Sequence, residues 1–270
     1  MKVLIVSLFL FIFFIVGCNG QNITVMSYNI HVGIGTDKKL DLDRIASVIS
    51  KEKPDIVSLN EIETCVKRTL CVNQIEYLAQ KTNMYYAFGP NLIDEAGCAD
   101  CNAGMFGNAV LSRHKIIKTE NHRLYRAASE EIRGCLEVEI EIEGKKIAFL
   151  SAHLDYHREE DVRNNQARDI LKIINENDMP VIFAGDMNAY LRTDGDDVEN
   201  AAQILTEKLY DTANANSAQK RIGTLMKGKR IDFIFVNKYL ADSVCDYRVI
   251  NYGDAKVASD HFPIVAKIKR

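Results

Sequence analysis

Carboxylate, amide and imidazole side chains recur at the ends of apolar segments along this chain. Those of interest are Asn29, Glu61, His153, Asp186, Asn188, Asp232, Asp260 and His261. Oxygen-bearing groups of this kind bind hard cations, and together with imidazoles they hydrogen-bond phosphate oxygens and carry protons. Such a set predicts metal-assisted hydrolysis of a phosphate ester.

The stretch VIFAGDMNAY sets Asp186 and Asn188 two positions apart after an apolar run. If the chain stays extended through Gly185, the alternation of a strand points both side chains the same way. Each polar residue taken singly has a structural explanation, since Asp and Asn form turns after strands and an isolated His is often a hydrogen-bonded structural residue. The full set favours function.

Alternating, β-rich segments predict strands at 23–30, 55–59, 181–185, 231–236, 246–250 and 263–268, and a hairpin at 135–150 around the turn EGKK. Helical spacing predicts helices after Asp41, around 75–79 and over 159–175. Strands that alternate with helices, together with one hairpin, predict an α/β fold with a mixed sheet. No repeat or linker interrupts the pattern, so we expect one domain over 21–270.

Length and charge leave several partners open. A chain of 270 residues with 47% hydrophobic content can bury a large core. The net charge of -3 gives no basic footprint of an obligate nucleic-acid binder, but a nuclease that acts through bound cations needs none.

The first residues indicate export. Lys2 precedes an apolar run from Val3 to Val16 that is too short to span a bilayer and is typical of a signal peptide, which we place at 1–20. We therefore expect a secreted protein. The motif IVGC gives the alternative of a lipoprotein tethered to a membrane through Cys18.

Six cysteines follow the expected signal: Cys65, Cys71, Cys98, Cys101, Cys135 and Cys245. An even count in an exported protein predicts disulfides, and the short spacings 65–71 and 98–101 predict small closed loops. A zinc site of four cysteines is the alternative, which the irregular spacing disfavours.

The polar segments, in this order, resemble the endonuclease/exonuclease/phosphatase superfamily, which includes pancreatic-type deoxyribonucleases, AP endonucleases, sphingomyelinases and inositol phosphatases. GDMN, RIDFIFV and SDHFP carry the resemblance, GNAVLSR at 107–113 adds to it, and it spans about Thr24 to Ile268. It implies a four-layer α/β/β/α sandwich of two packed mixed sheets, with the site at one edge.

Carried over position by position, the family pattern makes Glu61 the principal Mg²⁺ ligand, with Asn29 and Asp260 close to the metal. Oxygen ligands suit Mg²⁺, or Mn²⁺ as the alternative. The same pattern assigns roles to the remaining five residues. Asp186 would orient or deprotonate the attacking water and Asn188 would hold it, His261 paired with Asp232 would stabilise charge on phosphorus, and His153 would donate to the phosphate or the leaving oxygen.

These features predict a secreted Mg²⁺-dependent phosphodiesterase, a nuclease, that acts as a monomer without an organic cofactor. The absence of tryptophan disfavours the inositol polyphosphate 5-phosphatases. The opening SYNIHVGIGTDKKLDLDRIASVI resembles relatives of the hydrolase-like part of the Cwh43 GPI-lipid remodelling proteins, so a phospholipid or sphingomyelin phosphodiesterase is the alternative. A non-catalytic binding module on the same fold is the alternative from another class.

Overall fold

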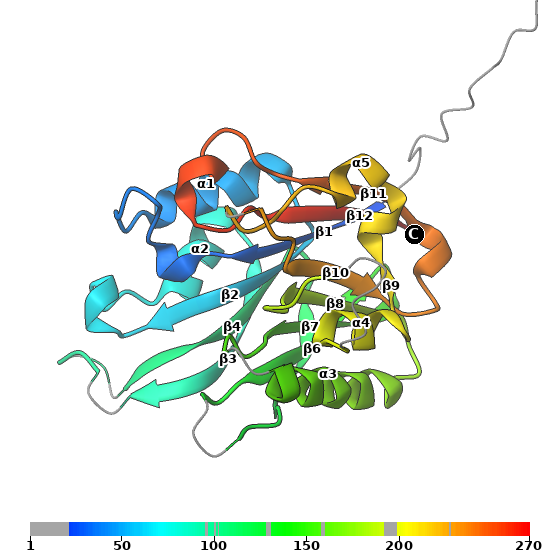
Figure 1. Ribbon diagram of the computed structural model, residues 1–270. Coiled ribbons are helices and arrows are strands. Elements are labelled where there is room, and N and C mark those ends of the chain that lie inside the picture. The colour runs from blue at the N-terminus through cyan, green and yellow to red at the C-terminus, as the bar shows by residue number, and fades with distance from the viewer. Residues whose placement is uncertain are drawn as a thin grey trace, which may run out of the picture.

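The computed structural model describes residues 22–94, 97–99, 101, 103–127, 131–157, 160–191, 199–226 and 228–270. The expected signal segment, with Cys18, lies outside these residues. Two six-stranded sheets pack against each other (Figure 1). The first has the strand order β11 (Val244–Val249), β12 (Ile264–Lys269), β1 (Asn22–Asn29), β2 (Ile56–Thr64), β4 (Gly104–Ser112), β3 (Tyr85–Asp94). The second has the order β5 (Ile116–Arg123), β6 (Gly134–Ile142), β7 (Lys145–His153), β8 (Val181–Asp186), β10 (Asp232–Val236), β9 (Tyr210–Asp211).

Both sheets are mixed, as the sequence predicts. β1 runs parallel to β2 and β7 runs parallel to β8, whereas the other pairs are antiparallel. The predicted hairpin is β6 and β7, which pair from Cys135 with Ala152 to Ile142 with Lys145. Its turn uses Glu143 and Gly144 in the left-handed region.

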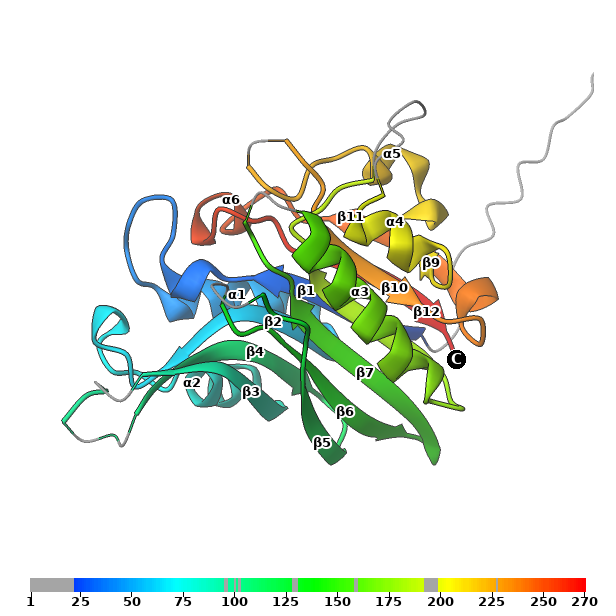
Figure 2. The same cartoon turned by 60° about the horizontal axis from the view of Figure 1, so that its bottom comes forward.

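Helices cover the two outer faces of the sheet pair (Figure 2). α1 (Leu42–Glu52) and α2 (Gln74–Thr82) share an apolar cluster with β1, β2 and β4. α3 (Glu160–Asn175) and α4 (Ala201–Thr206) share another with β7, β8 and β10. A third cluster fills the space between the sheets, with Val25, Phe149 and Ile234 fully buried. This arrangement confirms the expected α/β/β/α sandwich.

The remaining elements are short. They are α5 (Ser217–Lys220), α6 (Ala255–Ala258) and four 3-10 turns, η1 (His31–Gly33), η2 (Lys67–Thr69), η3 (Thr212–Ala215) and η4 (Ala241–Ser243). α1 begins after Asp41, as the sequence predicts, and the Asp41 carboxylate caps it by accepting a hydrogen bond from the Arg44 amide at 2.9 Å. Among the described residues, no helix has the length and apolar character needed to cross a membrane.

Candidate active site

The predicted site residues converge at one edge of the sheet pair because neighbouring strands end or begin there. In the second sheet, Asp186 pairs with His153 of β7 on one side and with Asp232 of β10 on the other. In the first sheet, Asn29 at the end of β1 pairs with Asn60 of β2, next to Glu61. Five strands therefore place five of the eight predicted residues at this edge, namely Asn29, Glu61, His153, Asp186 and Asp232.

Asn29 joins the two sheets at this edge. Its side-chain amide donates to Glu61 Oε1 at 3.0 Å and to Asp186 Oδ2 at 3.1 Å. Its Oδ1 accepts from the His31 amide at 3.0 Å, and this contact fixes which end of the amide faces the carboxylates. Asn29 is 1% exposed. One buried amide thus sets the separation between the carboxylates of Glu61 and Asp186.

The expectation of an extended chain from Asp186 to Asn188 is wrong. β8 ends at Asp186, and Asn188 adopts the left-handed region with φ of 46°. The backbone amide of Asn188 donates to Asp186 Oδ1 at 2.9 Å, which closes a tight turn. Through this turn the side chains of Asp186 and Asn188 reach the same site. The turn is favoured because the short side chain of Asp186 accepts from a backbone amide that lies beyond the end of β8.

Gly185 permits the close approach of β7 and β8 just before this turn. An ideal Cβ at residue 185 would lie 1.8 Å from the Ala152 carbonyl oxygen, and φ is +149°. Only glycine tolerates both conditions. The glycine in GDMN therefore allows Asp186 to sit beside His153.

His261 and Asp232 form the predicted pair. Nδ1 of His261 lies 2.9 Å from Asp232 Oδ2, and its Nε2 lies 3.7 Å from Asp186 Oδ2. Burial alone would lower the pKa of His261, but the charge and hydrogen bond of Asp232, with the charges of Asp186 and Asp260, outweigh it and raise the pKa to about 10. The imidazole is therefore a cation at neutral pH.

Asp186 is the most perturbed carboxylate of the site. Burial raises its pKa, the neighbouring charge of Asp232 raises it further, and His261 and two hydrogen bonds oppose these effects, so that the pKa is about 7. A carboxylate with a pKa near neutrality has the protonation behaviour expected of a general base.

His153 is held neutral on the other side of Asp186. Burial, followed by the charges of Arg133 and His261, lowers its pKa well below the ordinary value. Its Nε2 lies 2.9 Å from Asn188 Nδ2, which also donates to the Leu154 carbonyl at 3.0 Å. Because the amide of Asn188 donates, Nε2 of His153 accepts and the proton of its ring lies on Nδ1.

Asp260 lies at the same edge as Glu61. The hydroxyl of Ser259 donates to the Asn29 carbonyl at 2.8 Å, which ties the segment that precedes β12 to the end of β1. The side chain of Asp260 is 44% exposed and lies 3.9 Å from His31 Nδ1. Glu61 sits at an irregularity in the pairing of β2 with β4, with φ of 59°.

Two sets of side chains at this edge are candidates for a divalent ion. Glu61 and Asp260 are partly exposed carboxylates, and the oxygen chemistry of this set fits Mg²⁺ or Mn²⁺. Asp186, Asp232 and His261 offer atoms within 4.8 Å of one another. Both nitrogens of His261 face carboxylates, however, and a protonated imidazole is not a metal ligand. An ion at Asp186, Asp232 and His261 would therefore require His261 to lose its proton.

Two residues that sequence reasoning missed support the site. Asn60 accepts from the Asp186 amide at 3.1 Å and donates to the Ala152 carbonyl at 3.1 Å and to Asn108 Oδ1 at 2.9 Å. Arg133 is 3% exposed and its charge acts on His153. Asn60 could have been found from its place directly before Glu61 in SLNE. Arg133 follows a polar segment, and no sequence pattern marks it as part of the site.

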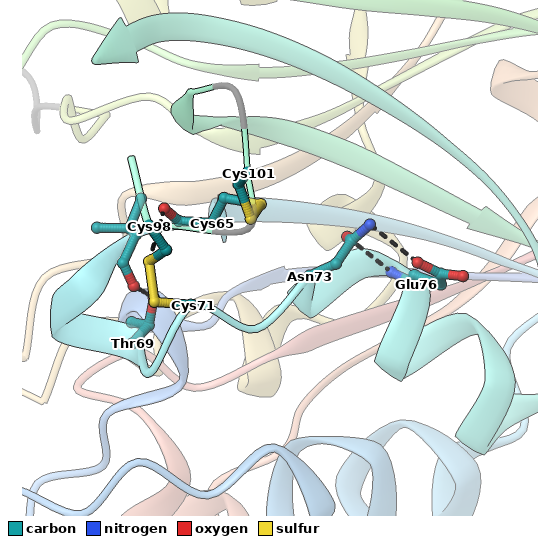
Figure 3. Close-up of a disulfide and its surroundings, with 8 residues drawn as sticks. Cys65, Thr69, Cys71, Asn73, Glu76, Cys98 and Cys101 are labelled. Carbon is teal, nitrogen blue, oxygen red and sulfur yellow. Dashed lines mark hydrogen bonds between the residues drawn. A yellow bond between two sulfur atoms is a disulfide. The ribbon is translucent and has the colours of Figure 1, made fainter. Parts of the chain in front are cut away.

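Two disulfides brace the segment that follows Glu61 (Figure 3). They join Cys65 to Cys101 and Cys71 to Cys98. The expectation of small closed loops within 65–71 and 98–101 is wrong, because the two segments are cross-linked to each other. Cys135 is free and fully buried, so the cysteines that follow the expected signal are not all paired.

Comparisons with known proteins agree with this geometry. The sequence matches the model of the Endonuclease/Exonuclease/phosphatase family over residues 26–261. An endonuclease/exonuclease/phosphatase from Beutenbergia cavernae has a similar structure, with a TM-score of 0.75 at 22% identity over 92% of this chain and 71% of that one. D. rerio TDP2, complexed with a single-strand DNA product, has a TM-score of 0.67 at 21% identity over 92% and 99%. A mannosyl-6-phosphatase from Bacteroides thetaiotaomicron has a TM-score of 0.67 at 18% identity over 90% and 98%.

Proposed function

The chain belongs to the endonuclease/exonuclease/phosphatase family of metal-dependent phosphoric ester hydrolases, and from this premise we propose that it is a Mg²⁺-dependent phosphodiesterase that cleaves nucleic acid. The observation that carries the proposal is the bridge from Glu61 through Asn29 to Asp186, beside an imidazolium paired with Asp232. It supports a site with a metal ligand, a base and a cation around one phosphate.

Glu61 and Asp260 would hold the ion, with Asn29 orienting the carboxylate of Glu61. A divalent ion there supplies positive charge that offsets the anionic diester, which otherwise repels a nucleophile. Because the Asn29 amide donates to Glu61 Oε1, the other carboxylate oxygen is left to face the metal.

Asp186 would take the proton of the attacking water, since its pKa of about 7 lets it accept a proton near neutral pH. Asn188 would hold that water. Its amide hydrogens are used by His153 and Leu154, which leaves the amide oxygen to accept from the water.

His261 would face the charge that builds on the phosphoryl oxygens. It enters the reaction already protonated, because Asp232 stabilises the imidazolium, and such prearranged charge is usually the largest contribution to catalysis. We assign neutral His153 to the phosphate or leaving-oxygen side. To donate there, its ring would carry the proton on Nε2 and give up the contact with Asn188.

We further propose that the protein is exported after removal of residues 1–20 and acts as a monomer of the single domain 21–270. The pairs Cys65–Cys101 and Cys71–Cys98 support export, since stable disulfides form in oxidising compartments. Mass spectrometry of the mature N-terminus checks this proposal. A lipid-modified Cys18 at the mature N-terminus would support the tethered alternative instead.

A substrate panel tests the proposed function. Plasmid DNA, RNA, sphingomyelin and an inositol phosphate are each incubated with Mg²⁺ and with EDTA, using the wild type and Glu61→Gln. We expect cleavage of nucleic acid that needs Mg²⁺ and falls about 10²-fold or more in the variant. Cleavage of sphingomyelin alone would identify the lipid branch, and turnover that survives both EDTA and Glu61→Gln would refute the proposed site.

A further inference from the structure

A hollow of about 270 Å³ adjoins the catalytic cluster on the side of Asn188. Three segments line it: the loop after β7 with Tyr156 and His157, the turn after β8 with Asn188 and Tyr190, and the chain before β10 with Lys229. Its volume is below that of an ordinary pocket for a drug-sized ligand. Because Asn188 belongs to both, the hollow is next to the place where the active site would hold a phosphate.

The hollow presents two tyrosine rings to solvent. Tyr156 is 59% exposed and its ring is stacked on the His157 imidazole at 4.4 Å between centroids. Tyr190 is 39% exposed, and the ammonium of Lys229 lies 4.5 Å from its ring centroid. Exposed aromatic side chains stack well on flat rings, and each base of a nucleic acid offers such a face.

The loop that carries Tyr156 is fixed rather than loosely attached. The fully buried carboxylate of Asp155 accepts from the His157 amide at 2.8 Å and contacts its imidazole at 2.9 Å. The buried guanidinium of Arg163 donates to the carbonyls of Asp155 and His157. Since these contacts anchor the loop to α3, the aromatic pair is in place before a ligand arrives.

Lys229 gives the hollow a cation that suits an anionic ligand. It lies over the Tyr190 ring, whereas the Arg133 guanidinium, 5.7 Å from the Tyr156 centroid, is paired with Glu131 at 2.8 Å. Aromatic rings also bind quaternary ammonium groups such as choline, but Lys229 on Tyr190 would repel one. Glu160 also lines the hollow, and its carboxylate can accept from an exocyclic amino group of a base.

We propose that this hollow binds the nucleoside attached to the scissile phosphate, with its base against the tyrosine rings and its next phosphate at Lys229. The inference rests on the proposed function and deepens it, because it selects a nucleotide chain over a choline lipid. Tyr156, Tyr190 and Lys229 are then specificity residues, and none of them takes part in the chemical step.

The test compares a diester with and without a nucleoside. The substrates are the p-nitrophenyl esters of thymidine 5′-phosphate and thymidine 3′-phosphate, and methyl p-nitrophenyl phosphate. We expect Tyr156→Ala and Tyr190→Ala to lower kcat/KM by roughly 5- to 100-fold on one of the nucleoside esters. The methyl ester should change less than about twofold, and Tyr156→Phe should behave as the wild type.

A matched control exists at the far end of the molecule. Tyr239 is 51% exposed and carries Lys238 at 5.2 Å from its ring centroid, and it follows the end of β10 opposite to Asp232. Tyr239→Ala should leave all three rates unchanged.

Three results would overturn the nucleoside subsite: equal losses on the methyl ester, no loss on either nucleoside ester, or cleavage of the methyl ester alone. If the wild type still cleaves the methyl ester in EDTA, the proposed metal-dependent function is refuted instead. Failure of the subsite and failure of the function are therefore distinguishable.

Discussion

Replacing Asp232 with asparagine tests whether His261 acts as a prearranged cation. Burial disfavours the imidazolium, and Asp232 is the largest of the influences that oppose it, through a contact of 2.9 Å. The rise of the pKa from 6.5 to about 10 corresponds to about 5 kcal/mol in favour of the charged form. Asn has nearly the shape of Asp and lacks the charge, so the substitution removes the main support of the imidazolium without opening a cavity.

We expect the pKa of His261 to fall to its ordinary value or below in Asp232→Asn, so that the ring is mostly neutral at pH 7.5. The value of kcat/KM at that pH should fall about 10²- to 10³-fold. Titration of labelled histidine by NMR reports the ring, and a pH profile of kcat/KM reports its consequence. Asp242→Asn is the control, because Asp242 is an exposed carboxylate on η4.

The same substitution changes how stability depends on pH. The pKa of His261 is higher in the folded protein than in the unfolded chain, so its protonation stabilises the fold. This stabilisation is complete below pH 6.5 and is lost as the pH rises toward about 10. Urea unfolding should therefore show the wild type weakening across this window and Asp232→Asn weakening much less. An imidazolium that persists at pH 7.5 in the variant, or an unchanged rate, would refute this reasoning.

Three further substitutions test how the structure holds the site. Gly185→Ala should lower the free energy of unfolding in urea by more than about 3 kcal/mol, because the new Cβ would meet a backbone oxygen. The control Gly144→Ala, with φ of +78° and open space around it, should lower it by about 1 kcal/mol. Equal losses would contradict this explanation. The pair Cys71→Ser and Cys98→Ser should lower the unfolding free energy by about 2–3 kcal/mol, because the Cys65–Cys101 disulfide remains and already closes most of the loop, and a stability equal to the wild type would count against it. Asn60→Leu should cost at least about 3 kcal/mol and lower kcat, because it leaves the Asp186 amide without its partner, and retention of both stability and kcat would show that Asn60 does not position Asp186.

Much of the site could be predicted because its residues share one local signature. Asn29, His153 and Asp186 each end a strand whose apolar character is clear in the sequence, and parallel neighbours bring such ends to one edge. The pairing of His261 with Asp232 needed the family resemblance, since no local pattern relates residues that lie 29 positions apart.

The remainder depends on contacts that a linear pattern does not contain. Asn60 bridges to groups on β4, β7 and β8, so its role exists only once the two sheets pack. β5 was not predicted because the edge strand IIKTENHR is mostly exposed and lacks apolar alternation. The disulfide pairing follows from the way β2 and the segment before β4 lie together, whereas short spacing along the chain suggested local loops.

The turn at Asn188 shows where a strand rule fails. Period-two alternation placed Asp186 and Asn188 on the same side, and both side chains do reach the site. They do so because Asp186 captures the Asn188 amide and turns the chain into the left-handed region. The side chain that carries the chemistry also ends the strand.

The position of a bound ion tests the central claim most directly. Crystals grown with Mn²⁺ would be measured at the manganese absorption edge to locate the ion by anomalous scattering. We predict a peak about 2.0–2.3 Å from a carboxylate oxygen of Glu61, with Asp260 beside it. An ion held instead by Asp186, Asp232 and His261, or by Glu120, His122 and Glu137, with none at Glu61, would contradict the account.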